Sequence, residues 1–493
     1  MGYLADLAKI NIIGSGIAGM SAAALLAKEG HEVIVLEKNS RPGGRINFFD
    51  AEGFRFDMGP SWYWMPEVFD NFYKIFGYQS SDFYELVRLD PSYSVYFEDE
   101  VVEVPARYEN LKKIFEQKDP GSSERLESFM QSAAMKYKVG MEEFVWKPGN
   151  SILEFIDRRV ISSLFKLQMI GSISKEVKKI TKNKSLQHIL EFPVLFLGAT
   201  PQNTPALYSL MNHADLKLGS WYPLGGMYEI AKAFYKIALE QGVQFHFDQE
   251  VLALDCKEDK VVSIQTNKAS YKGDFIIANA DYNHVDQKLL AKKFQSYDHA
   301  YWESRDLAPS SLLVFLGIKG KIEGLKHHNL FFDADFEKHT NEIYSTPRWP
   351  ENPLFYVCNP SKTDSLVAPE GCENLFLLMP IAPGLKDKPS LFKLYLNKFL
   401  SRIEKQTGQN LKSRILFKKY FSIDDFNNEY HSFKGNAYGL ANTLSQTAFL
   451  KPKMKSKKLT NLFFAGQMTT PGPGLPPSII SGQVAAYQIL KRL

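Results

Sequence analysis

The chain has 493 residues, of which 44% are hydrophobic and 13% aromatic, and its formal net charge is +4. This length exceeds what one hydrophobic core supports, so we expect two or three structural units in a globular protein. So small a net charge, without a dense array of basic and stacking aromatic residues, argues against nucleic-acid binding. The three cysteines are scattered and form neither a disulfide framework nor a metal motif, so we expect a reducing compartment and no metal.

The first predicted element leads into a nucleotide-binding turn. Residues 10–13 form a short β-branched run that is typical of a buried parallel strand. Glycines at G-x-G-x-x-G spacing follow, allowing a tight turn, close approach to a pyrophosphate and close packing of the helix predicted over residues 20–28. The N-terminus of that helix would face the pyrophosphate. This part of the predicted site comprises Gly14, Gly16, Ile17, Ala18 and Gly19.

A second strand is predicted at residues 32–36, and Glu37 and Lys38 follow it. Glu37 lies 18 residues after Gly19, close to the spacing of the acid that binds ribose hydroxyls. The next motif contains Gly43, Gly44 and Arg45. Arg45 could donate charge-assisted hydrogen bonds to phosphate, and the alternative is a solvated basic loop.

The end of the chain carries a second glycine-rich turn. A strand is predicted at residues 462–466, then the Thr-Pro-Gly-Pro-Gly-Leu-Pro-Pro turn of residues 470–477, then a helix over residues 478–492. The N–H groups and dipole of this helix would face a negatively charged part of the bound nucleotide. The predicted site residues here are Gly466, Gln467, Gly474, Pro477, Ser478 and Ile479.

The sequence pattern in the middle of the chain predicts further helices and two sheets. Residues 109–213 are mostly helical in pattern, and residues 221–227 open a helix that runs to about residue 241. Four strands at residues 243–247, 250–254, 261–266 and 275–278 are predicted to form one continuing sheet. Strands at residues 312–317, 330–332 and 375–379 and a helix at residues 391–406 are assigned to a second sheet. His327 and His328 are expected at the surface, and the lysines between residues 451 and 458 are consistent with an exposed loop.

These motifs resemble the bacterial-type carotenoid desaturases, the phytoene desaturase-like members of the FAD-containing amine oxidase superfamily. The resemblance covers nearly the whole chain and is strongest at residues 12–19, 43–45, 57–62, 222–226, 435–439 and 463–482. The chain departs from many relatives at residues 222–224 and at residues 467–468, which puts the exact substrate in doubt.

The resemblance implies FAD as cofactor and an α/β fold. Its expected parts are a discontinuous Rossmann-like FAD domain (residues 9–75, 215–290 and 455–493), a mixed-sheet substrate domain (76–108 and 291–454) and a helical subdomain (109–214). By the same resemblance, Gly59, Pro60 and Ser61 lead towards the flavin, Val251 meets the adenine, and Asn279 ends a site strand.

The implied reaction is dehydrogenation of a lipophilic polyene by hydride transfer to flavin N5, with oxygen or a membrane quinone as final acceptor. No catalytic residue is assigned; Tyr222, Asn436 and Tyr438 either reach the active site or form its wall. Phytoene is the leading substrate, and a 1'-hydroxycarotenoid desaturated at the 3,4 bond is the rival. A non-catalytic escort for prenylated partners is the alternative from another class.

Such a substrate predicts a cytoplasmic protein that associates peripherally with a membrane. Residues 151–190 carry eight basic against three acidic residues, interleaved with apolar ones, as in a basic amphipathic helix on anionic lipid. The alternative is a helix packed on the core with a solvated basic face. No signal peptide and no transmembrane helix are predicted.

Overall fold

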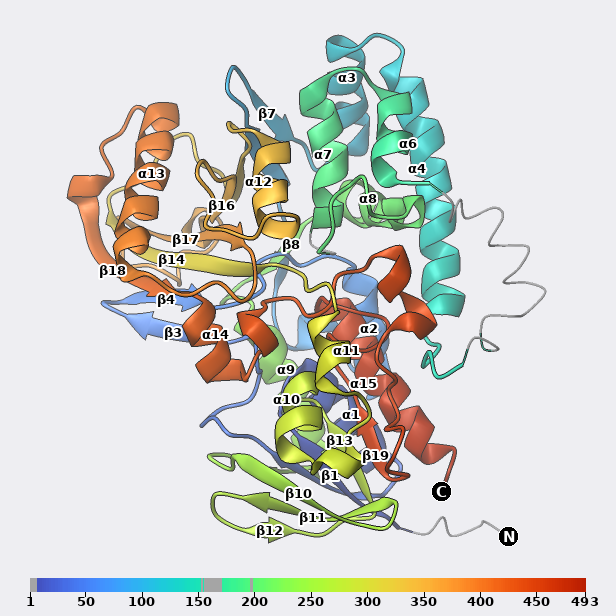
Figure 1. Ribbon diagram of the computed structural model, residues 1–493. Coiled ribbons are helices and arrows are strands. Elements are labelled where there is room, and N and C mark those ends of the chain that lie inside the picture. The colour runs from blue at the N-terminus through green and yellow to red at the C-terminus, as the bar shows by residue number, and fades with distance from the viewer. Residues whose placement is uncertain (1–6, 152–153, 155–170, 196–197) are drawn as a thin grey trace.

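The computed structural model describes residues 7–151, 154, 171–195 and 198–493. Three parts are visible: a parallel sheet with its covering helices, a larger mixed sheet, and a block of helices next to the larger sheet (Figure 1). The C-terminus lies beside the parallel sheet, close to the start of β1 (Figure 1).

A five-stranded parallel sheet forms the first part, in the order β19-β13-β1-β2-β9. Its strands are β1 (Lys9–Ile13), β2 (Glu32–Leu36), β9 (Gln244–His246), β13 (Phe275–Ala278) and β19 (Leu462–Phe464). They are short runs rich in β-branched and aromatic residues, which suit a sheet buried on both faces. The N-terminal, middle and C-terminal thirds of the chain therefore meet in one sheet.

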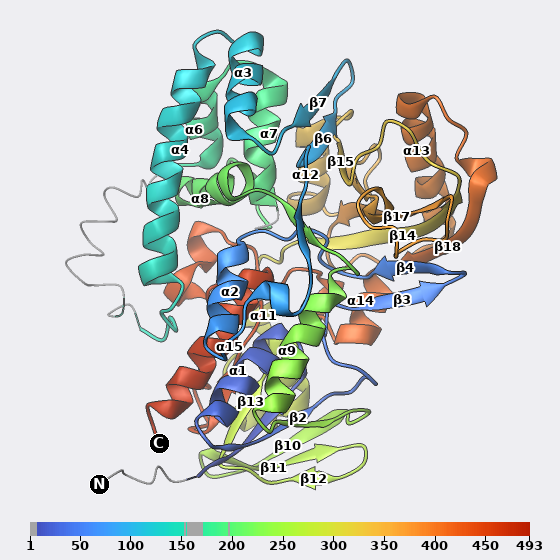
Figure 2. The same cartoon turned by 180° about the vertical axis from the view of Figure 1, so that it is seen from behind.

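Two different layers cover this sheet. On one face, Ile12, Val35 and Ile277 belong to the same apolar cluster as α1 (Ile17–Lys28), α9 (Tyr228–Glu240) and α15 (Leu475–Leu490), which lie together in Figure 2. On the other face, Ile34 and Ile276 pack with Val251, Leu254 and Ile264 of a small second sheet. Alternate residues of each strand thus supply two separate cores.

That small sheet corrects the prediction of one continuing sheet over residues 243–278. β10 (Val251–Lys257), β11 (Lys260–Thr266) and β12 (Ser270–Tyr271) form a separate antiparallel sheet, whereas β9 and β13 belong to the parallel sheet. The cause is the burial pattern. β10 and β11 bury only part of each strand, but three of the four residues of β13 are buried.

The segment at residues 221–227 also differs from its prediction as a helix start. Its first residues form β8 (Trp221–Pro223), paired with β5 (Leu86–Arg88), and α9 begins only at Tyr228. Gly225 and Gly226 both have positive φ, which ends the strand in a turn and delays the helix.

The second part is a seven-stranded mixed sheet in the order β18-β14-β17-β16-β15-β6-β7. Its strands are β6 (Tyr93–Tyr96), β7 (Val101–Val104), β14 (Ser310–Lys319), β15 (His328–Phe331), β16 (Phe355–Cys358), β17 (Cys372–Ile381) and β18 (Ile415–Phe421). Only β15 and β6 pair in parallel. Helices α12 (Phe336–Tyr344) and α13 (Pro389–Thr407) accompany it, and the hairpin of β3 (Phe48–Ala51) and β4 (Phe54–Asp57) packs Phe56 against Phe315.

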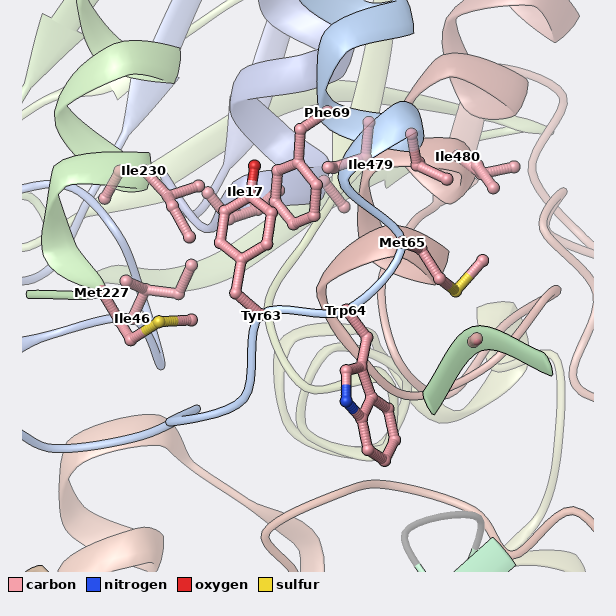
Figure 3. Packing of buried hydrophobic residues seen from close by; sticks show 14 of the residues in the cluster. Ile17, Ile46, Tyr63, Trp64, Met65, Phe69, Met227, Ile230, Ile479 and Ile480 are labelled. Atoms are coloured by element: carbon pink, nitrogen blue, oxygen red, sulfur yellow. The ribbon is translucent and has the colours of Figure 1, made fainter. Parts of the chain in front are cut away.

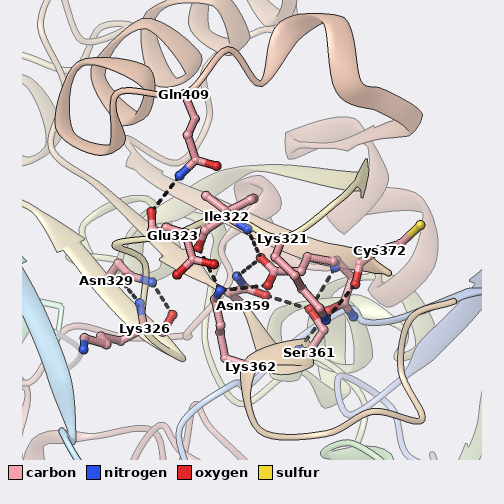
Figure 4. A network of polar contacts seen from close by, with 12 residues as sticks. Lys321, Ile322, Glu323, Lys326, Asn329, Asn359, Ser361, Lys362, Cys372 and Gln409 are labelled. Carbon is pink, nitrogen blue, oxygen red and sulfur yellow. Dashed lines mark hydrogen bonds and ion pairs between the residues drawn. The ribbon is translucent and has the colours of Figure 1, made fainter. Parts of the chain in front are cut away.

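A polar network ties the loops of this sheet together (Figure 4). The buried carboxylate of Glu373 lies 2.8 Å from Lys362 Nζ and accepts hydrogen bonds from Asn359 and from the backbone N–H of Ile322. Because a buried charge is costly unless it is paired, these contacts fix the loop of residues 359–362 against β17.

The third part is helical, as predicted for residues 109–213. It contains α3 (Tyr108–Lys118), α4 (Ser122–Val139), α6 (Ile173–Ile180), α7 (Lys184–Leu195) and α8 (Leu210–His213), with α2 (Pro66–Lys74) nearby. Part of the predicted basic segment, residues 152–153 and 155–170, lies outside the described residues. In its described portion, α6 buries Ile173, Val177 and Ile180 and exposes its lysines, so this helix packs on the core. Within the described residues, no helix is long and apolar enough to cross a bilayer.

One buried acid just after α8 gives a stability prediction. Asp215 is 1% exposed, accepts a hydrogen bond from the Tyr93 hydroxyl at 2.8 Å, and has no partner for Oδ1. Burial raises the pKa of Asp215 from its ordinary value of 3.8 to about 7. The folded state therefore binds this proton more tightly than the unfolded chain, and stability falls as pH rises between these two values.

We expect Asp215→Asn to remove this pH dependence. The variant should gain stability over the parent as pH rises from 4 to 7, by at most on the order of 4 kcal/mol, and the gain should level off above pH 7. Urea unfolding of both proteins at pH 5 and pH 8 measures the gain. An equal difference at both values would show that Asp215 is not protonated in the folded state.

Candidate functional site

A cavity that is open to solvent lies at the carboxyl ends of β1, β2, β13 and β19. In parallel sheets, ligands bind at this edge, where the loops that follow neighbouring strands diverge. The predicted site residues that line it are Gly14, Gly16, Ile17, Ala18, Glu37, Lys38, Gly43, Gly44, Arg45, Val251, Asn279, Gly466, Gln467 and Ser478. The fold therefore brings both glycine-rich ends of the chain, and the middle segment, to one cavity.

The first turn leaves no space for a side chain at Gly19. A Cβ at Gly19 would lie 2.3 Å from the carbonyl oxygen of Gly14, so α1 can follow β1 this closely only with glycine there. Gly14 has φ +95, and its carbonyl accepts a hydrogen bond from the Asn279 side chain at 3.2 Å. Gly19 thus acts through packing and does not line the cavity.

The carboxylate of Glu37 has a fixed orientation at the cavity wall. It accepts hydrogen bonds from the backbone N–H of Ser15 (2.9 Å), the Ser15 hydroxyl (2.7 Å) and the backbone N–H of Asn39 (2.9 Å). Glu37 is only 5% exposed. A carboxylate held in this way is suited to accept hydrogen bonds from ribose hydroxyls.

Arg45 presents a cation to the cavity. Its guanidinium donates to the Ser432 hydroxyl at 2.6 Å and lies over the Tyr430 ring at 5.2 Å, but its buried Nε has no partner. Burial lowers the pKa of Arg45, and nearby Asp281 counters this effect. Burial also raises the pKa of Asp281 to about 6, against the influence of Arg45. A cation with an unused donor suits a pyrophosphate.

The opposite wall was missed by sequence reasoning. It includes Glu429 and Tyr430, the last two residues of α14 (Ile423–Tyr430) in the second part, and His431, which follows that helix. His431 stacks on His284 with ring centroids 4.1 Å apart and lies 3.1 Å from Glu250. No motif marks these residues, since only the packing of α14 brings them over the cavity.

Seven predicted site residues do not line the cavity: Gly19, Gly59, Pro60, Ser61, Gly474, Pro477 and Ile479. Gly59 packs against the loop of Arg45, which lines the cavity: a Cβ at Gly59 would lie 2.0 Å from the Arg45 carbonyl oxygen. Ile479 lies with Ile17, Ile46 and Tyr63 in a buried apolar cluster (Figure 3). Leu475 and Ser478, in the first turn of α15, are the residues of that helix that reach the cavity.

The prediction of surface positions for His327 and His328 is wrong. They are 4% and 0% exposed. His327 lies just before β15, so the two side chains do not point to opposite faces as neighbours within a strand would. Their ring centroids are 4.5 Å apart. His328 stacks on Trp62 at 3.9 Å, and its Nδ1 lies 2.6 Å from the Tyr356 hydroxyl. Burial lowers the pKa of His327 to about 3 and also lowers the pKa of His328, so both rings are uncharged. They pack between the loop of residues 57–62 and the second sheet.

The three side chains expected at or near an active site have different surroundings. Asn436 accepts from the Gly439 N–H and donates to the Phe433 carbonyl, both at 2.7 Å, so it shapes the turn of residues 433–439. Tyr222 is 1% exposed with an unpartnered hydroxyl in a small cavity that Asp57 and Cys358 also line. Tyr438 is half-buried.

Comparison with known proteins decides the family. Residues 17–490 match the model of the flavin containing amine oxidoreductases. A carotenoid 3,4-desaturase of Haloarcula japonica is 38% identical over 98% of this chain and 98% of its own. A zeta-carotene-forming phytoene desaturase of Myxococcus xanthus is 30% identical over 98% of this chain and 94% of its own. The chain belongs to the carotenoid desaturase family.

The fold and cofactor agree with this membership. A cyclohexylamine oxidase from Brevibacterium oxydans superposes with a TM-score of 0.60 over 98% of this chain and 99% of that one, at 15% identity, which supports the fold alone. As a desaturase-family flavoprotein, the chain is an oxidoreductase with FAD as cofactor. Its residues fit that group: the unpaired Arg45 Nε, the oriented Glu37 carboxylate, and Gly14 and Gly16, whose backbone lines the cavity.

Proposed function

We propose that this chain desaturates a C40 carotenoid. The observation that carries the proposal is identity of 38% and 30% to two carotenoid desaturases over 98% of the chain. The cavity that joins both glycine-rich ends supports it, since an escort protein has no need of such a complete flavin cradle. The hypothesis of a non-catalytic escort protein is therefore less well supported than the desaturase proposal.

The chemistry that bound FAD supplies is acceptance of a hydride, with its two electrons, from an sp³ carbon of the substrate. A proton leaves the neighbouring carbon, and a double bond forms between the two. Oxygen or a membrane quinone then reoxidises the cofactor. The protein's part is to hold the cofactor through Glu37 and Arg45, and the proton passes to solvent. A polyene stabilises developing positive charge by conjugation, so no strong acid or base is assigned.

We assign three units to this function. The discontinuous FAD domain comprises residues 9–75, 215–290 and 455–493, which supply all five strands of the parallel sheet. The substrate domain comprises residues 76–108 and 291–454, which supply all seven strands of the mixed sheet. The helical subdomain comprises residues 109–214. A lipophilic substrate requires contact with a membrane surface, and the exposed lysines of α6 would lie near anionic headgroups at a peripheral, cytoplasmic position.

Two substrates are candidates, and one observation favours one of them. The higher identity to a carotenoid 3,4-desaturase favours a later carotenoid, such as a 1'-hydroxylated one, over phytoene. We expect new double bonds in at least one of two bacterial hosts, one accumulating phytoene and one accumulating a 1'-hydroxycarotenoid. Chromatography and absorption spectra of the extracted pigments identify the product and count the desaturation steps. Unchanged pigments in both hosts, with a soluble FAD-loaded protein, would contradict the proposal.

A further inference from the structure

The lysine-rich segment of residues 451–458 does not behave throughout as the exposed loop expected from its sequence. Lys451 is 2% exposed, and its Nζ has no hydrogen-bond or ion-pair partner. It follows a short 3₁₀ turn (Ala448–Leu450), and its own backbone N–H bonds back to the Ala448 carbonyl at 3.2 Å. The amine is therefore directed into the protein, while Lys457 and Lys458 are exposed.

A second buried polar group lies at the same place. Asn442 is 2% exposed, and its Oδ1 has no partner. A Cβ at Gly472 would lie 3.3 Å from Oδ1 and Nδ2 of Asn442 and 3.5 Å from Lys451 Nζ. An amine and an amide, both buried and incompletely bonded, thus converge on one glycine.

Gly472 belongs to the turn at the flavin end of the cavity. The two residues that flank this turn, Thr469 and Leu475, both line the cavity, and α15 begins at Leu475. Glu37, the partner expected for the ribose, follows β2, whereas this turn follows β19 at the far edge of the parallel sheet. The isoalloxazine ring of FAD would therefore lie beside the turn that contains Gly472.

A buried amine without an acceptor is costly, and such groups in native proteins call for a ligand or another explanation. Burial alone lowers the pKa of Lys451 to about 7, with no carboxylate contributing to the shift. Lys451, Asn442 and Gly472 do not line the cavity themselves, so this amine would act on the pyrimidine end of the flavin through its charge, from behind the turn. The attraction strengthens on reduction, because the ring then carries more negative charge.

We propose that Lys451 and Asn442 complete the flavin site behind the turn of residues 470–474, with protonated Lys451 as the electrostatic partner of the reduced ring. This inference rests on the proposed function and assigns Lys451 no proton transfer. The hydride and its electron pair come from the substrate carbon, the proton of the neighbouring carbon leaves to solvent, and Lys451 keeps its own proton throughout. Its charge adds to the positive N-terminus of α15.

The test compares Lys451→Met, Lys451→Arg and Lys458→Met in the full-length protein. Lys458→Met removes an equal charge from an exposed position of the same segment. We expect Lys451→Met to weaken FAD binding to the apoprotein about tenfold or more, because an electrostatic partner is lost. The reduction equilibrium of bound FAD should also shift about tenfold towards the oxidised form, about 30 mV for two electrons. Lys451→Arg and Lys458→Met should stay close to the parent.

Stability separates this role from a structural one. Because methionine removes an unpaired buried amine, Lys451→Met should unfold at the same or a higher denaturant concentration. A folded Lys451→Met with parental FAD affinity and parental reduction equilibrium overturns the proposal. If that variant does not fold, FAD titrations of the parent and Lys451→Arg at pH 6 and pH 9 decide. Binding must then weaken at pH 9 in the parent alone, and equal weakening in both overturns the proposal. These measurements need no carotenoid. A failure of this inference can therefore be told apart from a failure of the proposed desaturase function.

Discussion

Replacing Gly482 by alanine is expected to destabilise the protein and weaken FAD binding, although alanine is the better helix former. Gly482 lies within α15, and a Cβ there would lie 2.1 Å from the Ala18 carbonyl oxygen and 2.8 Å from Ser21 Cβ. Helix propensity alone would stabilise the variant by about 1 kcal/mol. The clash involves backbone and can be relieved only by separating α15 from α1, which we expect to cost about 3 kcal/mol.

The separation would also act on the cofactor, because the N-terminal ends of both helices line the cavity through Ile17, Ala18, Leu475 and Ser478. Urea unfolding midpoints and the FAD content of the purified protein measure the two effects. Gly140→Ala is the matched control: Gly140 has helical φ and ψ, and its nearest neighbour would be a leucine methyl group at 3.6 Å. We expect that change to be neutral or slightly stabilising. Equal behaviour of the two variants would refute tight α1–α15 packing.

Replacing Arg45 by alanine is expected to weaken FAD binding by about 10–100-fold, the effect of losing hydrogen bonds between a charged donor and phosphate. The guanidinium contacts Ser432 and Tyr430 on the far wall and keeps a buried Nε without a partner. Its loss also removes the cation near the buried Asp281, so the pKa of that acid should rise further. Titration of the apoprotein with FAD, followed by quenching of flavin fluorescence, gives the affinity.

Arg41→Ala is the control for this change. Arg41 belongs to the same loop, but it lies over the Phe48 ring at 4.6 Å and does not line the cavity. We expect its affinity for FAD to stay within about twofold of the parent, as for most surface changes. If both arginine variants bind FAD alike, the assignment of Arg45 to the pyrophosphate is wrong.

The sequence by itself determined the near wall of the site. Gly14, Gly19 and Glu37 act through local geometry: a turn, a helix packed on its own strand, and an acid at the end of the next strand. All of that lies within one strand–helix–strand unit, so the spacing along the chain is enough to predict it. The pattern of apolar runs likewise predicted most strands and helices, and the resemblance of the glycine-rich motifs indicated the family.

Only the tertiary structure decided the rest. The far wall, with Tyr430 and His431, comes from a helix that no motif connects to the glycine turn. His328 and Lys451, both expected at the surface, are buried. Their burial depends on residues distant in the chain that pack over them, and the local sequence pattern does not contain this information. The same reason explains the separate β10–β11–β12 sheet: pairing partners are chosen by the surface each strand can bury, and that surface exists only once distant segments have met.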